Sequence, residues 1–243
     1  MTQAKIFLTA EWRHLAMLNY EIEPAILRPM VPTNTELDSW NGKIFVSLVG
    51  FMFLKTRVLG LPIPFHQNFE EVNLRFYVRY KSGSEWRRGV VFIKEIVPRW
   101  AIATVARIVY NENYAAMPMR HSLDLESGTI KPEGVVEYGW RYQSDWHHLR
   151  VKTKGAAQTL VAGSEEEFIT EHYWGYAAQK DGGCMEYQVE HPSWRVWQVS
   201  ESSLQCNIAA LYGKQYVEAF SGKASSAFVA DGSPIIVRKG VRL

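Results

Sequence analysis

FEEVNLRFYVR, residues 69–79, is the most informative segment of the sequence, because its side chains alternate in character with a period of two. Such an alternation predicts a β-strand with one apolar face. The apolar face consists of Val72, Leu74, Phe76 and Val78. The opposite face carries an acid, an amide, a guanidinium and a phenol in line, from Glu71, Asn73, Arg75 and Tyr77. A strand face that met only water would usually carry a looser mixture of Lys, Glu, Ser and Thr.

These four polar groups suit a small carboxylate or carbonyl compound held inside a closed sheet. Arg75 would clamp a carboxylate through two parallel N–H bonds, Asn73 and Tyr77 would donate to it, and Glu71 would fix the arginine. The alternative is an ordinary solvated strand face whose charges form cross-strand ion pairs. The sequence leaves both interpretations open.

The segments on either side also predict strands. Residues 43–55 are apolar on both faces, which is typical of a strand buried on both sides. Gly83 marks a bend before the apolar run 89–97, and Pro62 and Pro64 predict a loop over 60–66. Residues 12–22 predict a further strand, one face of which would hold Trp12, His14, Ala16, Leu18 and Tyr20.

The rest of the chain predicts more strands with a few short helices between them. Strands are expected over 117–125, 134–142, 146–153, 171–178, 185–189 and 195–199. Pro24 opens a short helix, and Pro98 begins one of about twelve residues. Ser164 and Glu167 form a capping box, and Asn207 caps a helix over 208–220. The dipeptide Asp231-Gly232 predicts the turn of a last hairpin over 225–239.

This pattern predicts the fold class. No linker rich in Pro, Gly or Ser divides the chain, so residues 1–243 are expected to form a single domain. The class is α+β and mostly antiparallel β, and a closed or nearly closed sheet would protect the edges of so many strands. The 9 Trp, 12 Tyr and 11 Phe are numerous for a core alone. Some of them are expected to line a cavity beside the polar stripe, with candidates at Phe51, Phe53, Phe76, Tyr77 and Phe92.

Charge and hydropathy argue against several classes of protein. The 27 basic and 25 acidic residues give a net charge of +2, which is too balanced for general nucleic-acid binding. No stretch approaches the roughly 20 apolar residues of a membrane-spanning helix, and residues 1–15 lack the long apolar region of a signal peptide. We therefore expect a cytoplasmic protein that binds neither nucleic acid nor membranes. Cys184 and Cys206 fit no zinc spacing and no disulfide framework, and free buried thiols are expected.

Lys94 is the candidate nucleophile. Its neighbours VVFI and EIV are nearly all apolar, and desolvation lowers the pKa of a lysine, as an amine that attacks a carbonyl requires. Arg87 and Arg88 are nearby cations that would add to this effect. The alternative is a lysine that extends to water or pairs with a glutamate. Lys55, which follows GFMFL, has a similar setting.

The other motifs that carry chemistry are missing. The 7 His show no HExxH or clustered spacing, and His147 and His148 point to opposite sides of a strand. The sequence contains no GxSxG elbow, Walker loop or GxGxxG fingerprint. We therefore expect neither a metal nor a cofactor.

The chain resembles the YqjF-like family of bacterial proteins, a branch of the acetoacetate decarboxylase-like superfamily. The resemblance covers most of residues 9–120, in TAEWRHLAMLNYEI, VPTNTELDSWNGKIFVSLVGF, FEEVNLRFYVR, RRGVVFIKEI and ARIVYNENY. It implies a β-barrel with a central cavity, flanked by additional sheet and a few helices. Arg13 and His14, in the first of these segments, are further candidates for substrate binding. Either Glu70 or Glu71 would correspond to a pocket glutamate of the superfamily.

The superfamily also supplies a mechanism, from which this sequence departs. Its decarboxylases form a Schiff base on a lysine, in a motif that reads Gly-Arg-Glu and, several residues later, Pro-Lys-Lys. Gly89 matches the glycine, but Val90 and Val91 replace Arg-Glu, and Pro-Lys-Lys is missing. Lys94 lies near the lysine position at a different spacing. This departure weighs against decarboxylation.

Three functions are consistent with these observations. The first is a small-molecule site for an apolar or aromatic carboxylate or carbonyl compound; in an enzyme of this kind, Lys94 would be the nucleophile and Glu71 the proton donor or acceptor. The second is a non-catalytic carrier or sensor that keeps the cavity and lacks the nucleophile. The third is an interaction protein that forms an oligomer, for example a homo-oligomer, through an interface of exposed aromatic residues.

Overall fold

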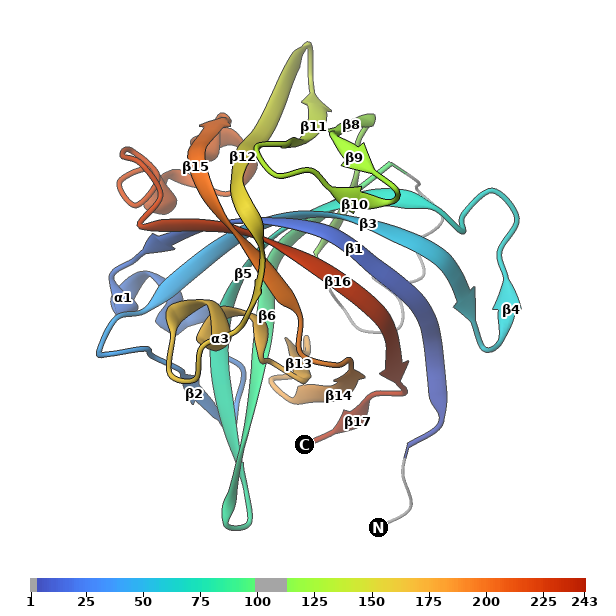
Figure 1. The fold of residues 1–243 in the computed structure, drawn as a ribbon. Helices are drawn as coiled ribbons and strands as arrows, with labels where there is room; N and C mark the ends of the chain where they lie inside the picture. Colours follow the sequence, from blue (N-terminus) through green and yellow to red (C-terminus); the bar gives the residue numbers. More distant parts are fainter. Residues whose placement is uncertain (1–3, 99–112) are drawn as a thin grey trace.

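A closed ring of hydrogen-bonded strands forms the centre of the computed structural model, which describes residues 4–98 and 113–243 (Figure 1). The ring closes because β14 pairs with both β13 and β16. Neighbouring strands of the ring pair antiparallel, except for a short parallel pairing between β13 and β6. The strands of the ring, in order of pairing, are β14 (Cys184–Glu190), β13 (Trp174–Ala178), β6 (Glu85–Val97), β5 (Phe69–Ser82), β3 (Phe45–Val58), β1 (Ile6–Glu21) and β16 (Ser226–Arg238). The expected closed, mostly antiparallel sheet is thus confirmed.

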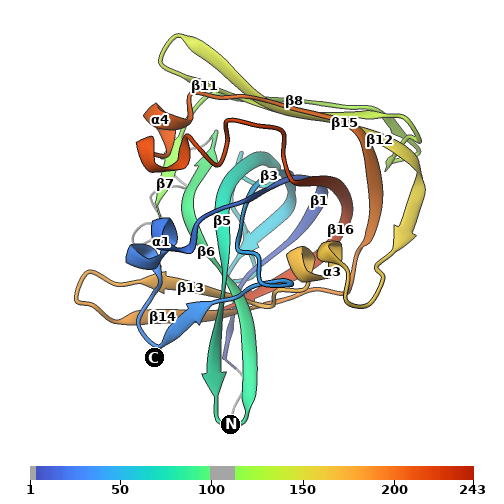
Figure 2. The same cartoon turned by 90° about the vertical axis from the view of Figure 1, so that its left-hand side faces the viewer.

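Four further strands extend the sheet from β16 and fold back over the outside of the ring (Figure 2). These four strands form a second layer, which we call the second sheet. They are β15 (Arg195–Gln205), β12 (Asp145–Thr159), β11 (Val135–Tyr142) and β8 (Met119–Leu123). The two layers approach closely at Gly50 of β3, where an added Cβ would lie 2.6 Å from Cδ2 of Tyr138. The Tyr138 hydroxyl donates a 2.9 Å hydrogen bond to the carbonyl of His14 on β1. The additional sheet implied by the resemblance is therefore present.

Short elements complete the described chain. The helices are α1 (Pro24–Leu27), α3 (Glu165–Thr170) and α4 (Ile208–Leu211), with the 3-10 turns η1 (Arg28–Met30) and η2 (Lys214–Tyr216). The short strands are β2 (Thr35–Leu37), β4 (Leu61–Pro62), β7 (Tyr114–Ala116), β9 (Leu125–Glu126), β10 (Thr129–Ile130) and β17 (Val241–Arg242). The helix expected after Pro98 falls almost entirely outside the described residues. Within them, no helix has the length and apolar character needed to cross a bilayer.

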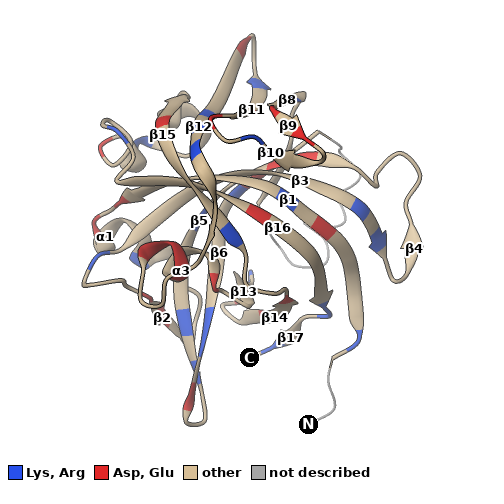
Figure 3. Ribbon diagram, in the orientation of Figure 1, with Lys and Arg blue, Asp and Glu red and all other residues tan. Residues whose placement is uncertain are grey.

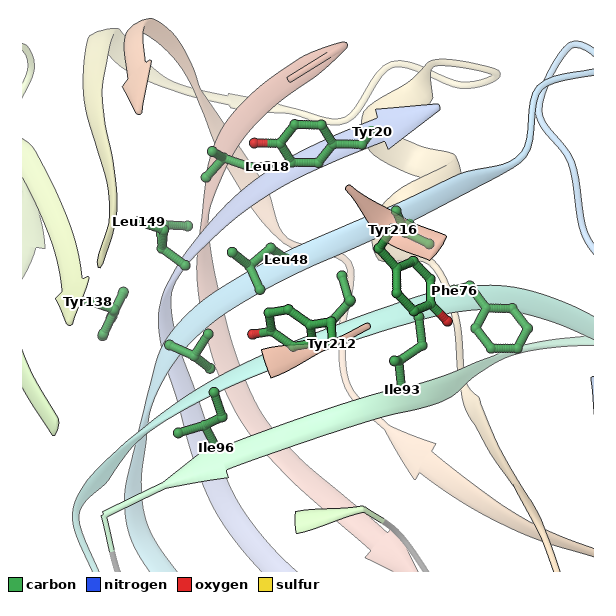
Figure 4. Packing of buried hydrophobic residues seen from close by; sticks show 14 of the residues in the cluster. Leu18, Tyr20, Leu48, Phe76, Ile93, Ile96, Tyr138, Leu149, Tyr212 and Tyr216 are labelled. Atoms are coloured by element: carbon green, nitrogen blue, oxygen red, sulfur yellow. The ribbon is translucent and has the colours of Figure 1, made fainter. Parts of the chain in front are cut away.

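The ring separates two apolar clusters. The outer cluster fills the space between the ring and the second sheet, and Figure 4 shows part of it. It includes Leu18, Leu48, Leu74, Phe76 and Trp140. The inner cluster lies within the ring and includes Leu15, Met17, Phe51, Phe69 and Trp194. The predicted apolar face of residues 69–79 packs entirely in the outer cluster, so its polar face points inward.

Strands β1 and β16 bend together at facing positions, and this bend corrects two expectations. His14 has a φ of 58° and Gly232 a φ of 76°, and the β1–β3 register shifts between Arg13 and Ala16. The shift places Trp12 with the inner cluster, whereas Ala16 and the later apolar residues of its predicted face belong to the outer cluster. The expected hairpin at Asp231-Gly232 was also wrong, because β16 runs through this position as one strand. A positive φ at glycine serves a bend within a strand as well as a turn.

The helix caps follow the predictions more closely than the helix lengths do. The Ser164 side chain accepts a hydrogen bond from the backbone N–H of Glu167, and acidic residues fill the first turn of α3 (Figure 3). Asn207 caps α4 in the same way, through the N–H of Ala210. The helix predicted over 208–220 stops at Leu211, however, because Gly213 adopts a φ of 118°.

Candidate functional site

A cavity of about 250 Å³ lies inside the ring, and most of its lining is apolar. The aromatic part of the lining includes Trp12, Phe51, Phe53, Phe69, Phe92 and Trp194. Cavities that combine an apolar lining with a few polar groups are typical small-molecule sites. Three of the aromatic residues proposed from the sequence, Phe51, Phe53 and Phe92, line it. Phe76 lies in the outer cluster instead, and Tyr77 is buried in the inner cluster behind the lining.

The aromatic wall is held in a fixed geometry. The Trp12 ring makes edge contacts with Phe51 at 5.6 Å and with Phe53 at 5.9 Å between ring centroids. Phe53 in turn stacks on Phe69 at 4.8 Å. Such aromatic pairs add about 0.5–1.5 kcal/mol each beyond the area they bury. The wall is therefore a rigid surface that suits a flat or aliphatic ligand body.

The polar stripe of β5 enters this cavity. Glu71, Asn73 and Arg75 all line it, with exposed fractions of 2%, 2% and 9%. The Asn73 amide donates a 2.9 Å hydrogen bond to Oε1 of Glu71. Tyr77 lies deeper, where its hydroxyl is 2.6 Å from Oγ of Ser47. The structure therefore brings three of the four residues of the stripe into the cavity and places the fourth behind its lining.

Arg75 is a buried cation without a carboxylate partner in the part of the chain that the structure describes. Its Nη2 donates a 3.2 Å hydrogen bond to the carbonyl of Ile169, and its Cζ lies 5.7 Å from the centroid of the Tyr77 ring. Within residues 4–98 and 113–243, no acidic oxygen comes within 4.0 Å of it, and Nε has no hydrogen-bond partner. A guanidinium stays charged in proteins, and an uncompensated buried charge is costly. An anion in the cavity would supply the counter-charge that this guanidinium lacks among the described residues.

A β-bulge interrupts the pairing of β5 and β6 beside this cation. Leu74 lies opposite Lys94, whereas Arg75 lies opposite Phe92, so Ile93 is an extra residue on β6. A bulge leaves one residue unpaired and shifts the alternation of every side chain beyond it.

The bulge determines which side chain of β6 reaches the cavity. Glu95 lines it and is 1% exposed. Lys94 lies on the outer side with Ile93, where its Nζ donates to the carbonyl of Leu211 and lies 5.9 Å from the Tyr212 ring centroid. Figure 4 shows Ile93 and Tyr212 in the outer cluster. Burial lowers the pKa of Lys94, but its amine is not in the cavity. The hypothesis of a lysine nucleophile needs the amine inside, and this placement removes Lys94 from the candidate site.

Sequence reasoning also missed His172, which lines the cavity just beyond α3 and is 7% exposed. Its ring lies 4.6 Å from that of Tyr77 and 5.5 Å from that of Phe168. Burial, followed by the charges of Arg88 and Arg75, lowers the pKa of His172 well below its usual value. The imidazole is therefore neutral at neutral pH. The motif-based reading of the histidines did not single it out, because its neighbours match no spacing.

The remaining predicted site residues lie outside the cavity. Oε1 of Glu70 is 2.6 Å from Nδ1 of His121 on the second sheet, and this contact raises the pKa of the histidine. Arg13 pairs with Glu11, and burial lowers the pKa of His14 at the bend of β1. Glu70, Arg13 and His14 therefore point away from the cavity. Side chains alternate along a β-strand, and β1 also bends at His14.

Lys55 and the cysteines also lie away from the site. Lys55 forms a 2.6 Å ion pair with Glu11. Cys184 and Cys206 are free thiols, as expected, but only Cys184 is buried and Cys206 is half-buried. Among the residues that the structure describes, no three His, Cys, Asp or Glu side chains are grouped as a metal site would require.

The chemistry available in the cavity follows from these groups. Arg75 attracts an anion, Asn73 and His172 supply polar contacts, and Glu71 and Glu95 are carboxyls able to exchange a proton. No lysine of the described chain lines the cavity. The site as described is therefore suited to binding a carboxylate beside an apolar body, and it supplies no amine for a Schiff base.

Comparisons with known proteins identify the family of the chain and its structural neighbours. The model of the family DUF2071, described as "Uncharacterized conserved protein", matches residues 9–234. Among curated proteins, "Uncharacterized protein YqjF" of Bacillus subtilis (strain 168) is 26% identical over 200 residues, which span 81% of this chain and 77% of that protein.

Solved structures share the architecture. The acetoacetate decarboxylase of Legionella pneumophila subsp. pneumophila str. Philadelphia 1 superposes with a TM-score of 0.67 at 14% identity, over 98% of this chain and 88% of its own. The enduracididine biosynthesis enzyme MppR complexed with pyruvate gives a TM-score of 0.70 at 10% identity, over 100% of this chain and 91% of its own. At these identities the likeness shows a common fold and nothing more.

Proposed function

Since the chain belongs to the DUF2071 family and has the acetoacetate decarboxylase-like fold that its resemblance to the YqjF-like family implied, we propose that its cavity binds a small carboxylic acid with an apolar or aromatic body. Arg75 is the carboxylate clamp in this proposal. The observation that carries it is a buried guanidinium with no carboxylate partner among the described residues, facing a cavity with aromatic walls.

The geometry around Arg75 supports a carboxylate more than a neutral ligand. Among the described residues, Nη2 donates to the carbonyl of Ile169 and Nε has no hydrogen-bond partner, so Nε is available to a carboxylate oxygen. Hydrogen bonds to charged groups contribute about 1.5–3 kcal/mol. The ligand body would rest on the wall around Trp12, where burial of apolar area contributes roughly 25 cal/mol per Å². A structural neighbour, MppR, was solved with pyruvate, which is also a small carboxylate.

Carriage or sensing fits the cavity better than Schiff-base chemistry. Lys94 donates its amine protons to the carbonyl of Leu211 on the outer side of β6, and a Schiff base needs an amine that meets the ligand. We therefore place the protein with non-catalytic carriers or sensors of a carboxylate. A lyase with Lys94 as nucleophile is the alternative, and it requires β6 to pair in a different register.

Binding of 3-phenylpropionate, measured by isothermal titration calorimetry, tests the proposal. We expect it to bind and to raise the melting temperature, whereas 3-phenylpropan-1-ol, which lacks the carboxylate, binds at least tenfold more weakly. Arg75→Met should weaken binding of the acid by at least tenfold, because a charged hydrogen-bond pair is lost.

Arg79→Met is the matched control, since Arg79 lies on the same face of the same strand but pairs with Glu36 at the surface and does not line the cavity. Equal affinity for the acid and the alcohol, or equal losses in the two arginine variants, would contradict the role of Arg75.

A further inference from the structure

His172 is a second basic group of the cavity, and the proposed function gives it no role in binding the ligand. Its side chain is more than nine-tenths buried and lines the cavity. Among the described residues, neither ring nitrogen makes a hydrogen bond of good geometry, and the nearby carbonyl of Ile169, which favours the charged ring, already accepts from Arg75. Buried polar groups are nearly always hydrogen-bonded, and each exception calls for an explanation. A ligand that supplies the missing partner is such an explanation.

His172 and Arg75 lie against the same ring. Tyr77 is 4.6 Å from the imidazole, between ring centroids, and 5.7 Å from the guanidinium carbon. The Arg75 charge also acts on the titration of His172. An anion held by Arg75 is therefore within the electrostatic reach of the imidazole.

The charged and titratable groups around His172 come from every side. Arg75 on β5 and Arg88 on β6 disfavour its protonation, and so does His191 after β14. Asp38, which follows β2, lies 3.9 Å from Nε2, but its carboxylate is already held by Arg88 at 2.7 Å. Without a ligand, the positive groups thus outweigh the negative one.

We propose that His172 is the second anchor of the ligand and that it takes up a proton as the carboxylate binds, donating an N–H to the carboxylate that Arg75 holds. This inference rests on the proposed function and specifies how the site recognises a carboxylate. The proton comes from solvent and forms a new N–H bond on the imidazole, so the site and its ligand together gain one proton, and no other covalent bond is made or broken.

The direction of the coupling follows from linkage. Burial and the two arginines keep the pKa of free His172 well below 6.5, so the free site is neutral at this position at pH 7. A carboxylate offsets the charge of Arg75 and attracts the imidazolium, which raises the pKa in the complex. A complex that binds more protons than its free components becomes tighter as the pH falls, by up to about tenfold per pH unit for one proton.

Calorimetric titration of the whole protein with 3-phenylpropionate tests this coupling. Repeating the titration at pH 7 in buffers of different ionisation enthalpy measures the protons taken up. We expect between about half and one proton per ligand, and an affinity that increases from pH 8 to pH 6. His172→Asn should abolish the uptake. His191→Asn is the matched control, because His191 lines the same cavity but is stacked between Tyr173 and Trp194.

The outcomes separate this inference from the function on which it rests. Failure of 3-phenylpropionate to bind at all contradicts the proposed function. Binding without proton uptake, or uptake that survives in His172→Asn, overturns the role of His172 and leaves the carboxylate site standing. The ¹⁵N chemical shifts of the wild-type imidazole nitrogens, recorded with and without the ligand, give the same decision without a variant. A shift to the imidazolium value supports the proposal, and an unchanged neutral imidazole refutes it.

Discussion

Individual residues with unusual backbone conformations shape the ring. Gly232 faces the bend of β1, and a Cβ added to it would lie 2.0 Å from the carbonyl oxygen of Trp12. No other residue type fits there, because the obstacle is backbone and the φ of 76° disfavours a side chain. This position also holds Trp12 on the cavity side.

Gly232→Ala should therefore destabilise the protein by at least ~2 kcal/mol, from the sum of a steric clash and an unfavourable φ. Chemical denaturation followed by tryptophan fluorescence measures the change. Gly222→Ala is the control, since an added Cβ at Gly222 meets no atom within 4 Å. Equal stability of the two variants would show that the strands do not approach at Gly232 as described.

The alternation of side chains along β5 made three polar residues of the site predictable. Glu71, Asn73 and Arg75 were found from the sequence because β5 alternates without interruption from one end of the stripe to the other. Glu95 was not, because GVVFIKEIV is apolar at nearly every position and contains no signal for the extra residue. His172 belongs to a different element, and only the fold brings it beside Arg75.

At the scale of elements, the bulge of β6 separates the cavity from the lysine. Two consecutive residues, Ile93 and Lys94, lie on the outer side, and the amine of Lys94 binds the carbonyl at the end of α4. The amine consequently supplies a hydrogen bond to the C-terminal end of α4, because the last carbonyls of a helix lack partners within it.

Lys94→Ala should leave the affinity for 3-phenylpropionate within about twofold of the wild type, because the amine lies across the sheet from the ligand. Incubation of the wild type with 3-oxobutanoate and borohydride, followed by intact-mass analysis, should give no reduced adduct. An adduct that is lost in Lys94→Ala would establish Lys94 as a nucleophile and refute the carrier or sensor assignment.

Element boundaries show the same division between what sequence predicts and what it does not. The caps at Ser164 and Asn207 were predicted because capping depends on neighbouring residues alone. The hairpin at Asp231-Gly232 was predicted wrongly, since this dipeptide signals a positive φ and does not distinguish a turn from a bend between paired strands.

At the scale of the whole molecule, a titratable contact links the two layers of sheet. His121 on β8 meets Glu70 on β5, and the hydrogen bond that the ring donates to this carboxylate raises the pKa of the histidine above 6.5. The closed sheet itself was predictable from the number of strands, but its second layer was not a consequence of strand count. It followed from the resemblance, because pairing partners so distant in sequence leave no local signal.

This contact predicts a pH dependence of stability. A histidine whose pKa is raised in the folded state contributes stability that is complete below the unfolded pKa, near 6.5, and is lost as the pH rises through the folded pKa. The pair is partly exposed, so we expect a contribution below ~1 kcal/mol. The free energies of unfolding of the wild type and His121→Gln should differ most near pH 6 and converge by pH 9. A constant difference over this range would contradict the ion pair.

The single extra residue of β6 has a consequence for how such sites diverge. Regular pairing without the bulge, with Ile93 opposite Leu74, would bring Lys94 into phase with Phe92 on the cavity side and turn Glu95 to the outer side. The same few residues thus place either a carboxyl or an amine in the cavity, and a one-residue change of register after Phe92 moves the protein from one to the other. In this fold, the pairing register of a strand specifies the chemistry of the cavity as much as the identity of its residues does.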